Sequence, residues 1–181
     1  MDANEILQEQ FLTFYLAAEE YAVPVLRVKE ILEYQVVTRV PNTPPWVRGV
    51  FNLRGSVVPV INLAAKLGLG EARITRSSCI IILEVNLKDE SLTIGVVVNS
   101  VSQVIDLKVT AVQPVPAFGV KVNTDYLLGI ANTDLMLTLL IDIDKIFSVE
   151  ELSHIGSAQS TASTESTPAE AAVAQGDARQ T

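Results

Sequence analysis

The pattern of hydrophobic and polar positions along the chain is typical of many short strands separated by turns. Short segments rich in Val, Ile, Leu and aromatic residues alternate with polar, proline-rich or glycine-containing stretches. We expect strands at 11–16, 21–24, 36–40, 50–53, 57–61, 78–85, 91–99, 101–106, 126–131 and 135–141. Because strands do not alternate regularly with helices, the pattern predicts an all-β barrel or sandwich architecture in two small units.

Two segments show a helical period. In residues 25–33 the apolar side chains Val25, Val28 and Ile31 recur at helical spacing, which predicts one or two turns of helix. Residues 142–152 also carry apolar side chains at helical intervals, and acidic residues stand at their start, where the helix dipole favours negative charge. We therefore expect a helix at the C-terminal end of the folded region.

Two further segments predict single helical turns. Residues 62–68 contain helix formers followed by Gly68, which is typical of a short helix that ends in a glycine cap. Residues 42–47 form a proline-rich turn, with Thr43 placed to cap one helical turn. Both turns are too short to be stable alone, so they must lie against the sheets.

The chain has 181 residues, of which 49% are hydrophobic and 19% are charged. Its longest apolar runs, such as 80–83 and 135–141, are far shorter than the roughly 20 residues of a membrane helix, so no span is expected. We interpret the polar residues 1–10 as a flexible leader; a secretory signal is not expected, because a basic stretch followed by an apolar one is missing. Residues 11–155 form the folded part, and the Ala/Ser/Thr-rich residues 156–181 are expected to be disordered.

Charge is unevenly distributed. The net charge is −8, yet residues 21–70 hold six Lys or Arg and two Glu, a local balance of +4 that leaves −12 for the rest. An acidic chain is a poor partner for nucleic acid, whose binding relies on many cations. The basic region is either ordinary solvated surface or a docking surface for an acidic protein segment. A nucleic-acid-binding barrel remains an alternative, which only this region could support.

Candidate catalytic groups are scarce. His154 is the only histidine and Cys79 the only cysteine, so zinc sites and histidine-dependent nucleophilic mechanisms lack the residues they need. Asp142 and Asp144 stand two residues apart at a helix start and point in different directions. The sequence therefore predicts a protein that is not an enzyme and has no metal or cofactor.

One basic residue lies where two strands meet. Arg54 precedes Gly55 between the expected strands 50–53 and 57–61. Because Gly55 can adopt a positive φ and turn the chain, Arg54 is expected at a strand end facing water. It is either a recognition residue or a solvated turn residue whose stem packs on neighbouring apolar surface.

A spaced set of motifs resembles the CheW family of bacterial chemotaxis coupling proteins. Among them are Val28-Lys-Glu-Ile31, Arg48-Gly-Val-Phe-Asn-Leu-Arg-Gly55 and Val58-Pro-Val-Ile-Asn-Leu63. The others lie at 11–14, 21–24, 37–45, 95–101 and 126–129. The resemblance implies two five-stranded SH3-like β-barrels with short helical turns and a C-terminal helix. It also implies a cytoplasmic, non-catalytic adaptor that holds a CheA-type histidine kinase to the cytoplasmic tips of methyl-accepting chemoreceptors in membrane-bound arrays.

The resemblance further implies partner-binding positions. Those that match family motifs are Val28, Glu30, Gly49, Arg54, Gly95 and Val104. Glu30 and Arg54 are charged and placed outside the core, so they are the better candidates for direct contact. Gly49, Gly95 and Val104 could instead matter only for strand packing.

A mechanism for partner binding follows from the apolar positions. We expect Val25, Val28 and Ile31 to build a groove at the seam between the barrels, into which a helical receptor tip packs. Arg54 and Glu30 would fix its register. Asn62 stands where family members commonly have Asp, so a local hydrogen bond could differ there.

Overall fold

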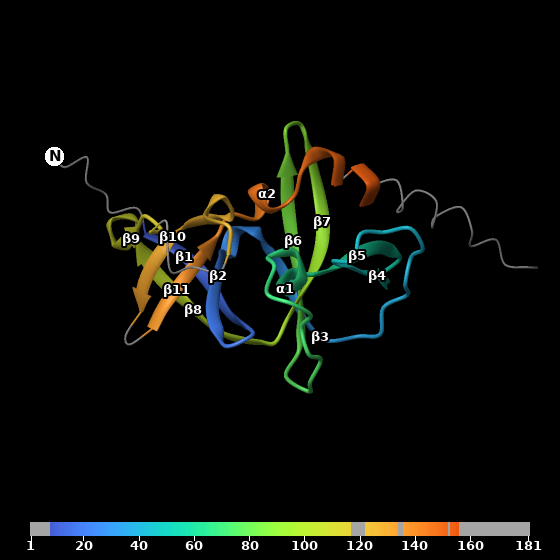
Figure 1. The fold of residues 1–181 in the computed structure, drawn as a ribbon, viewed down its shortest axis with the longest axis horizontal. Helices are drawn as coiled ribbons and strands as arrows, with labels where there is room; N and C mark the ends of the chain where they lie inside the picture. Colours follow the sequence, from blue (N-terminus) through green and yellow to red (C-terminus); the bar gives the residue numbers. More distant parts are fainter. Residues whose placement is uncertain (1–7, 117–121, 134–135, 152, 156–181) are drawn as a thin grey trace, which may run out of the picture.

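The computed structural model describes residues 8–116, 122–133, 136–151 and 153–155, which form two β-sheets (Figure 1). Its strands are β1 (Gln8–Leu16), β2 (Glu19–Pro24), β3 (Val28–Glu33), β4 (Val47–Leu53), β5 (Ser56–Asn62), β6 (Cys79–Leu87), β7 (Glu90–Val98), β8 (Ser100–Lys108), β9 (Val112–Gln113), β10 (Leu127–Thr133) and β11 (Met136–Ile141). Its helices are η1 (Val25–Arg27), α1 (Leu63–Lys66), η2 (Val109–Ala111), η3 (Thr124–Tyr126) and α2 (Ile143–Ile146). The predicted tail 156–181 lies outside the described residues, and β1 begins at Gln8, inside the expected leader.

The two ends of the chain build one barrel and its middle builds the other. The first sheet has the strand order β8-β1-β2-β11-β10-β9 and is called barrel A, while β3-β6-β7-β5-β4 is called barrel B. They lie side by side in Figure 1, with the long β6–β7 hairpin beside the junction. The all-β, two-barrel prediction is confirmed, and barrel A gains a sixth strand in the two-residue β9.

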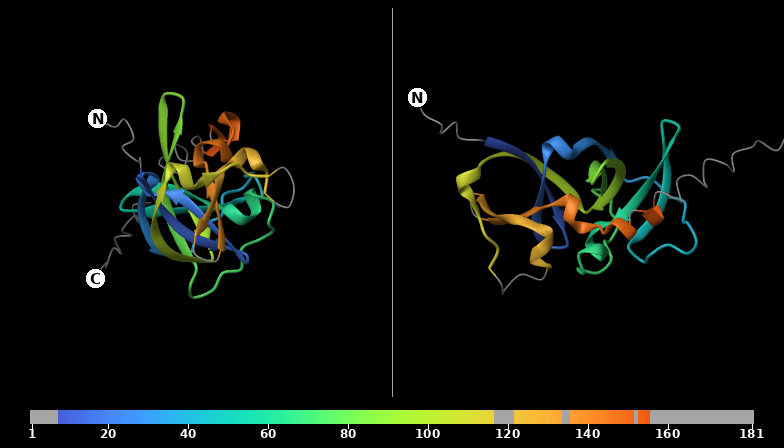
Figure 2. Two further views of the ribbon diagram at one scale, coloured as in Figure 1. Left: turned by 90° about the vertical axis from the view of Figure 1, so that its left-hand side faces the viewer. Right: turned by 90° about the horizontal axis from the view of Figure 1, so that it is seen from above.

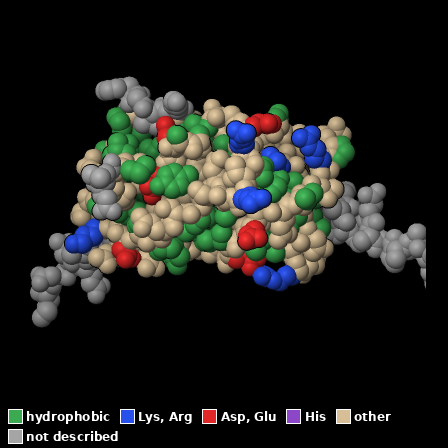
Figure 3. All heavy atoms as spheres, turned by 90° about the horizontal axis from the view of Figure 1, so that it is seen from below, with side chains coloured by type: hydrophobic (Ala, Val, Ile, Leu, Met, Phe, Trp, Pro, Cys, Tyr) green, Lys and Arg blue, Asp and Glu red, His purple; other side chains and the backbone are tan. Residues whose placement is uncertain are grey.

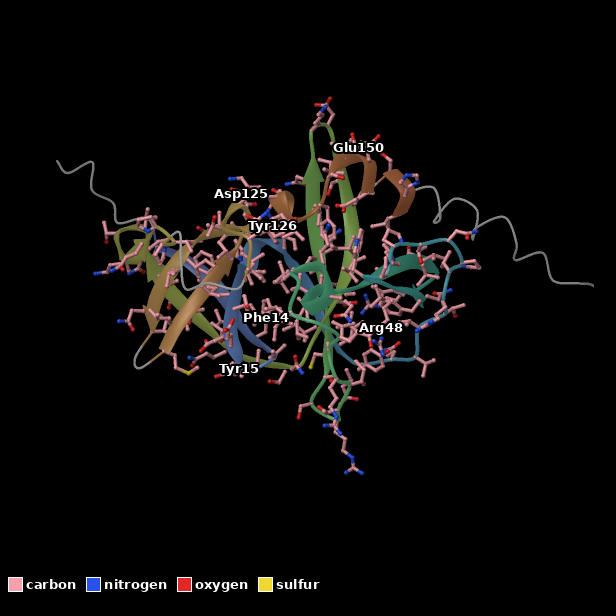
Figure 4. All side chains as sticks on the ribbon, in the orientation of Figure 1. Phe14, Tyr15, Arg48, Asp125, Tyr126 and Glu150 are labelled. Carbon is pink, nitrogen blue, oxygen red and sulfur yellow. The ribbon has the colours of Figure 1, made fainter. Side chains whose placement is uncertain are left out.

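Hydrophobic side chains form three clusters. Each barrel has a small interior of its own, around Phe11 and Leu140 in barrel A and around Val60 and Ile82 in barrel B. The largest cluster joins the two sheets, and Phe14 contributes to it from β1 (Figure 4). Successive residues of a strand face opposite sides, so β6 serves both the barrel B interior and the seam. The seam is therefore packed core.

The two barrels repeat one hairpin at a spacing of 80 residues. Val47 pairs with Ile61 and Gly49 with Val60, and the same shifted pairing joins Leu127 to Ile141 and Gly129 to Leu140. In both copies the residue that follows the last paired position, Ile61 or Ile141, caps a four-residue helix. Asn62 Oδ1 accepts from Ala65 N at 3.2 Å, and Asp142 Oδ1 accepts from Asp144 N at 3.2 Å. The amide Asn62 thus makes a capping bond of the same kind as the aspartate.

The helix predicted for residues 25–33 is wrong. Val25–Arg27 is a single 3₁₀ turn, and Val28–Glu33 is strand β3 on β6. A β-bulge between Val28 and Glu30 inserts one extra residue, so Val28 pairs with Leu83 while Ile31 pairs with Ile81. The bulge places Val28 and Ile31 on the same face, although they are three residues apart. The three-residue apolar spacing in the sequence therefore marks a bulged strand, not a helix.

The structure corrects three other local predictions. Residues 36–40 contribute only an isolated bridge between Thr38 and Val50, and 42–46 contain turns but no helix before β4 begins at Val47. The predicted helix 142–152 is broken, because α2 ends at Ile146 and Phe147 has extended backbone with φ −112° and ψ 140°. Residues 149–151 and 153–155 are helical again. Viewed from above, this segment runs from barrel A to barrel B (Figure 2).

Candidate partner-binding surface

Three of the predicted partner-binding positions lie in one cross-strand row of barrel B. The row runs across all five strands through the paired residues Glu30, Ile82, Gly95, Val60 and Gly49. Glu30 and Gly49 stand on the two outer strands, β3 and β4, and Gly95 stands in the middle. Positions far apart in the sequence therefore form a single structural unit.

Arg54 and Glu30, the two charged candidates, are in contact. Arg54 Nη2 donates to Glu30 Oε2 at 2.8 Å, which joins the β4–β5 turn to β3. The Arg54 side chain is 74% exposed and that of Glu30 is 24% exposed. Glu30 Oε1 is buried and has no hydrogen-bond donor in the described part of the chain. The pair thus offers an incoming group an accessible guanidinium, which a mostly buried carboxylate holds in place.

The turn that carries Arg54 has an unusual backbone. Arg54 and Gly55 both have positive φ, 51° and 87°, which matches the two-residue hairpin turn whose twist suits antiparallel strands. Asn52 Oδ1 accepts from Gly55 N at 2.8 Å and fixes the turn. A non-glycine residue rarely adopts this region, so Arg54 occupies a position that local backbone preference does not favour.

A hollow of about 560 Å³ lies beside this ion pair. Arg54 and Glu30 line one side, and Lys29, Ser91 and Thr93 line another. Lys29 Nζ donates to Thr93 Oγ1 at 3.0 Å and lies 3.4 Å from Glu84 Oε2. The hydrogen bond from Ser91, followed by those interactions with Lys29, holds the pKa of Glu84 below its ordinary value. The hollow is therefore lined by charged and polar groups and, to a similar extent, by apolar side chains such as Leu53, Val57 and Leu92.

Among the described residues, the space between the barrels is packed core rather than the expected apolar groove. Val25 and Val28 are partly buried against the seam cluster, which fills the space between the sheets. Ile31 differs, since it remains 42% exposed on the outer strand β3. Of the three apolar residues, only Ile31 is on an accessible surface, and it faces the opposite side of β3 from Glu30.

The two candidate glycines are buried and have packing roles. A Cβ at Gly49 would lie 2.3 Å from Thr38 O, and its φ of +151° is unfavourable for other residues. A Cβ at Gly95 would lie 2.8 Å from Ile80 Cγ2. Val104 is different, because it lies in β8 of barrel A and is 53% exposed. The structure therefore separates Val104 from the other six positions.

Aromatic residues of the basic region are occupied by the protein itself. Tyr21 and Phe51 are buried. Trp46 packs on Phe147 with ring centroids 5.7 Å apart and so covers an edge of the core. Arg48 lies over the Tyr34 ring and donates to its hydroxyl at 2.7 Å. A face of free aromatic and basic side chains, which single-stranded nucleic acid requires, is missing from these residues.

Lys and Arg side chains gather over the barrel B half of the molecule in Figure 3. Among the described residues, no group of three His, Cys, Asp or Glu could hold a metal ion. No helix in that part of the chain is long and apolar enough to cross a membrane. What the surface of barrel B presents is a charged, partly hollowed face beside an exposed apolar edge.

Comparisons with known proteins agree with this picture. The model of the CheW-like domain matches residues 10–151. The chain belongs to the CheW family. Chemotaxis protein CheW of Klebsiella aerogenes is 36% identical over 153 residues, which cover 84% of this chain and 90% of that protein. Protein FrzA of Myxococcus xanthus is 30% identical over 123 residues, 68% of this chain and 74% of that one.

A solved structure has the same fold. The scaffolding protein TtCheW from Thermoanaerobacter tengcongensis superposes with a TM-score of 0.71 at 28% identity, covering 83% of this chain and 95% of that one. The predicted pair of SH3-like barrels is thereby confirmed, as is membership among the CheW scaffold and adaptor proteins. The nucleic-acid alternative is not favoured.

Sequence reasoning missed one side of the hollow in this CheW-family chain. Lys29, Glu84 and Ser91 form a polar network there, with Ser91 Oγ donating to Glu84 Oε1 at 2.7 Å. A usable signal was present, because Glu84 is a lone carboxylate in an otherwise apolar strand. The sequence carried no such signal for Lys29, since only the bulge in β3 brings its side chain to the hollow.

Proposed function

We propose that this chain is a non-catalytic adaptor that holds a CheA-type histidine kinase to the cytoplasmic tips of methyl-accepting chemoreceptors. The chain would be cytoplasmic and would reach the membrane only through the receptors in their arrays. Membership of the CheW family supports this role. So does the shortage of catalytic groups in the sequence, with one histidine and one cysteine.

The observation that carries the proposal is the Arg54–Glu30 pair at the rim of the hollow. Arg54 is largely exposed and is held by a single 2.8 Å hydrogen bond to Glu30. A partner that supplies a carboxylate would find the guanidinium already oriented for a further charge-assisted hydrogen bond. Apolar contact area beside the charges comes from Leu53, Val57 and Leu92, which line the same hollow.

Such a surface combines apolar burial with flanking charges. Apolar burial supplies affinity, while charged groups fix register and exclude wrong partners. A modest affinity at each site is sufficient in an array, because many linked contacts raise occupancy. In this interpretation Gly49 and Gly95 act indirectly, by allowing the strands of barrel B to pack and to hold Glu30 in place.

The test is the charge reversal Arg54→Glu, measured by co-sedimentation with receptor-containing membranes and by pull-down of the CheA-type kinase. Binding should fall at least about tenfold, since the reversal places two carboxylates together at the surface. Arg76→Glu is the matched control, because Arg76 is an exposed arginine in the polar loop before β6. Equal binding by wild type and Arg54→Glu, with the fold intact, would refute the proposed surface.

A further inference from the structure

A second hollow in barrel B lies toward the open end of the β4–β5 hairpin, away from the Arg54 turn. Its volume is about 710 Å³. The apolar part of its wall consists of Val40, Pro41, Pro44, Val47, Val50 and Pro59. Because apolar concave surfaces of this size are favoured places for ligands and peptide segments, this hollow is a candidate binding site.

The C-terminal segment ends at this hollow. Ile155 is 5% exposed and lines the hollow together with His154. Figure 1 shows the described chain ending beside β4 and β5. Residues 156–181 therefore begin at the rim, and any segment of them is tethered close to the apolar wall.

Within residues 156–181, apolar side chains are concentrated in Pro168-Ala-Glu-Ala-Ala-Val-Ala174. Val173 is the only branched aliphatic residue of the tail, which has no Leu, Ile, Met or aromatic residue. If one part of the tail binds an apolar wall, this segment offers the most area to bury.

Charges on the two sides are complementary. Arg39 and Arg48 line an adjoining hollow, which shares Val40, Pro44 and Val47 with the 710 Å³ hollow. The tail carries Glu165 and Glu170 before Val173. Opposite charges at the rim of an apolar contact favour one orientation of the bound segment.

We propose that residues 168–174 dock into this hollow of their own chain, with Val173 in the apolar part and Glu170 toward Arg39. The tether makes the contact intramolecular, at an effective concentration on the order of millimolar, so even a weak contact is substantially occupied. The 18 residues from Ile155 to Val173 reach about 23 Å as a flexible chain, which is ample for a site beside Ile155. This self-contact is independent of the partner surface at Arg54.

Amide hydrogen exchange on the full chain, resolved by residue, tests this contact. The reporters are the amides of Val47 and Val50, which bond to Pro44 O and Thr38 O beside the hollow. Val173→Asp should speed their exchange by about threefold, because the docked segment no longer restrains the loop. Ala162→Asp is the control, since it adds the same charge to the tail outside the docking segment and should leave exchange unchanged.

A charge swap and a dilution series complete the test. Arg39→Glu should speed exchange of the same amides, and combining it with Glu170→Arg should restore protection. Unchanged exchange in Val173→Asp would overturn the proposal. Protection that disappears on dilution would also overturn it, because the occupant would then be the tail of a second copy. None of these variants alters the core, so loss of folding does not obscure the result.

Discussion

The two barrels share one framework and differ in what they place on it. The row of barrel B, Glu30–Ile82–Gly95–Val60–Gly49, is matched in barrel A by Gln103–Thr13–Ala22–Leu140–Gly129. In barrel A, Thr13 Oγ1 donates to Gln103 O and accepts from Gln103 N, which fastens the bulge internally. Ile82 cannot do this in barrel B, and the Glu30 carboxylate bonds to Arg54 instead. The bulge is thus held by hydrogen bonds within the sheet in barrel A. In barrel B the residue at the bulge bonds instead to an exposed arginine, which a partner can reach.

The helices after the matched hairpins differ in a similar way. Ile146 of α2 is 1% exposed in the seam cluster. The matching residue of α1 is Lys66, whose side chain is 8% exposed and donates to Glu151 Oε1 at 2.6 Å. Its ammonium also lies 4.7 Å from the centre of the Trp46 ring. Barrel B therefore uses a nearly buried ion pair to hold the C-terminal segment where barrel A uses packing.

The largest effect is expected from Gly49→Ala. The added Cβ would meet Thr38 O, and the backbone φ is unfavourable, so the free energy of unfolding should fall by about 2–3 kcal/mol. Gly129→Ala should cost less, because its neighbours Val112 and Gln113 belong to the two-residue edge strand β9, which can shift. Urea unfolding of both variants measures the two losses in the free energy of unfolding. Equal losses would mean that the matched glycines have the same role.

The architecture was predictable because it depends on patterns that sequence shows directly. Alternation and β-branched runs gave the strands, and helix formers followed by Gly68 gave the short helix α1. The helix predicted at 25–33 failed because three-residue apolar spacing arises from a helix or from a bulged strand, and only pairing with β6 decides between them. The break at Phe147 likewise depends on packing against Trp46, which is distant in sequence.

The candidate site was predictable only in part. Arg54 and Glu30 were identified as separate charged residues, but their contact depends on barrel closure, which brings β3 to the β4–β5 turn. The hollow beside them was missed, since its lining comes from all five strands of barrel B. The alternation of apolar and polar residues predicts which face of a strand each residue occupies. A concave site depends instead on which strands lie next to one another, and this alternation does not show it.

Thr13→Val is expected to have the next largest effect. Valine keeps the shape of threonine but leaves the Gln103 N–H and carbonyl without their partner, so stability should fall by about 1–2 kcal/mol. Binding to kinase and receptor should be unchanged once unfolded protein is accounted for, because Thr13 is fully buried in barrel A. A selective loss of binding would show that the barrel A bulge also takes part in recognition.

Glu151→Gln should lower stability by about 1 kcal/mol at neutral pH, since Lys66 loses its ionic partner. Burial alone would raise the pKa of Glu151, but hydrogen bonds from Lys66 and Ser148 hold it below the ordinary 4.5. A depressed pKa in the folded state stabilises above the unfolded value and is lost as pH falls through the folded value. The difference between wild type and Glu151→Gln should therefore be present in full above the unfolded value of 4.5 and be lost as the pH falls through the lower pKa of the folded state. A difference that persists in acid would exclude the ion pair as its cause.

Glu30→Gln is expected to change stability least, because it gives barrel B the residue that barrel A has at the matching position. The pair is at the surface, with Arg54 74% exposed, so removing it should alter stability by less than about 0.5 kcal/mol. Partner binding should nevertheless fall, since the amide no longer orients Arg54 by charge. Gln103→Glu is the reciprocal control and should confer no binding on barrel A, because Gln103 is not joined to an arginine there. A double-mutant cycle with Arg54→Gln separates the two roles: strong coupling in kinase or receptor binding with weak coupling in unfolding assigns the pair to recognition, and the reverse assigns it to the fold.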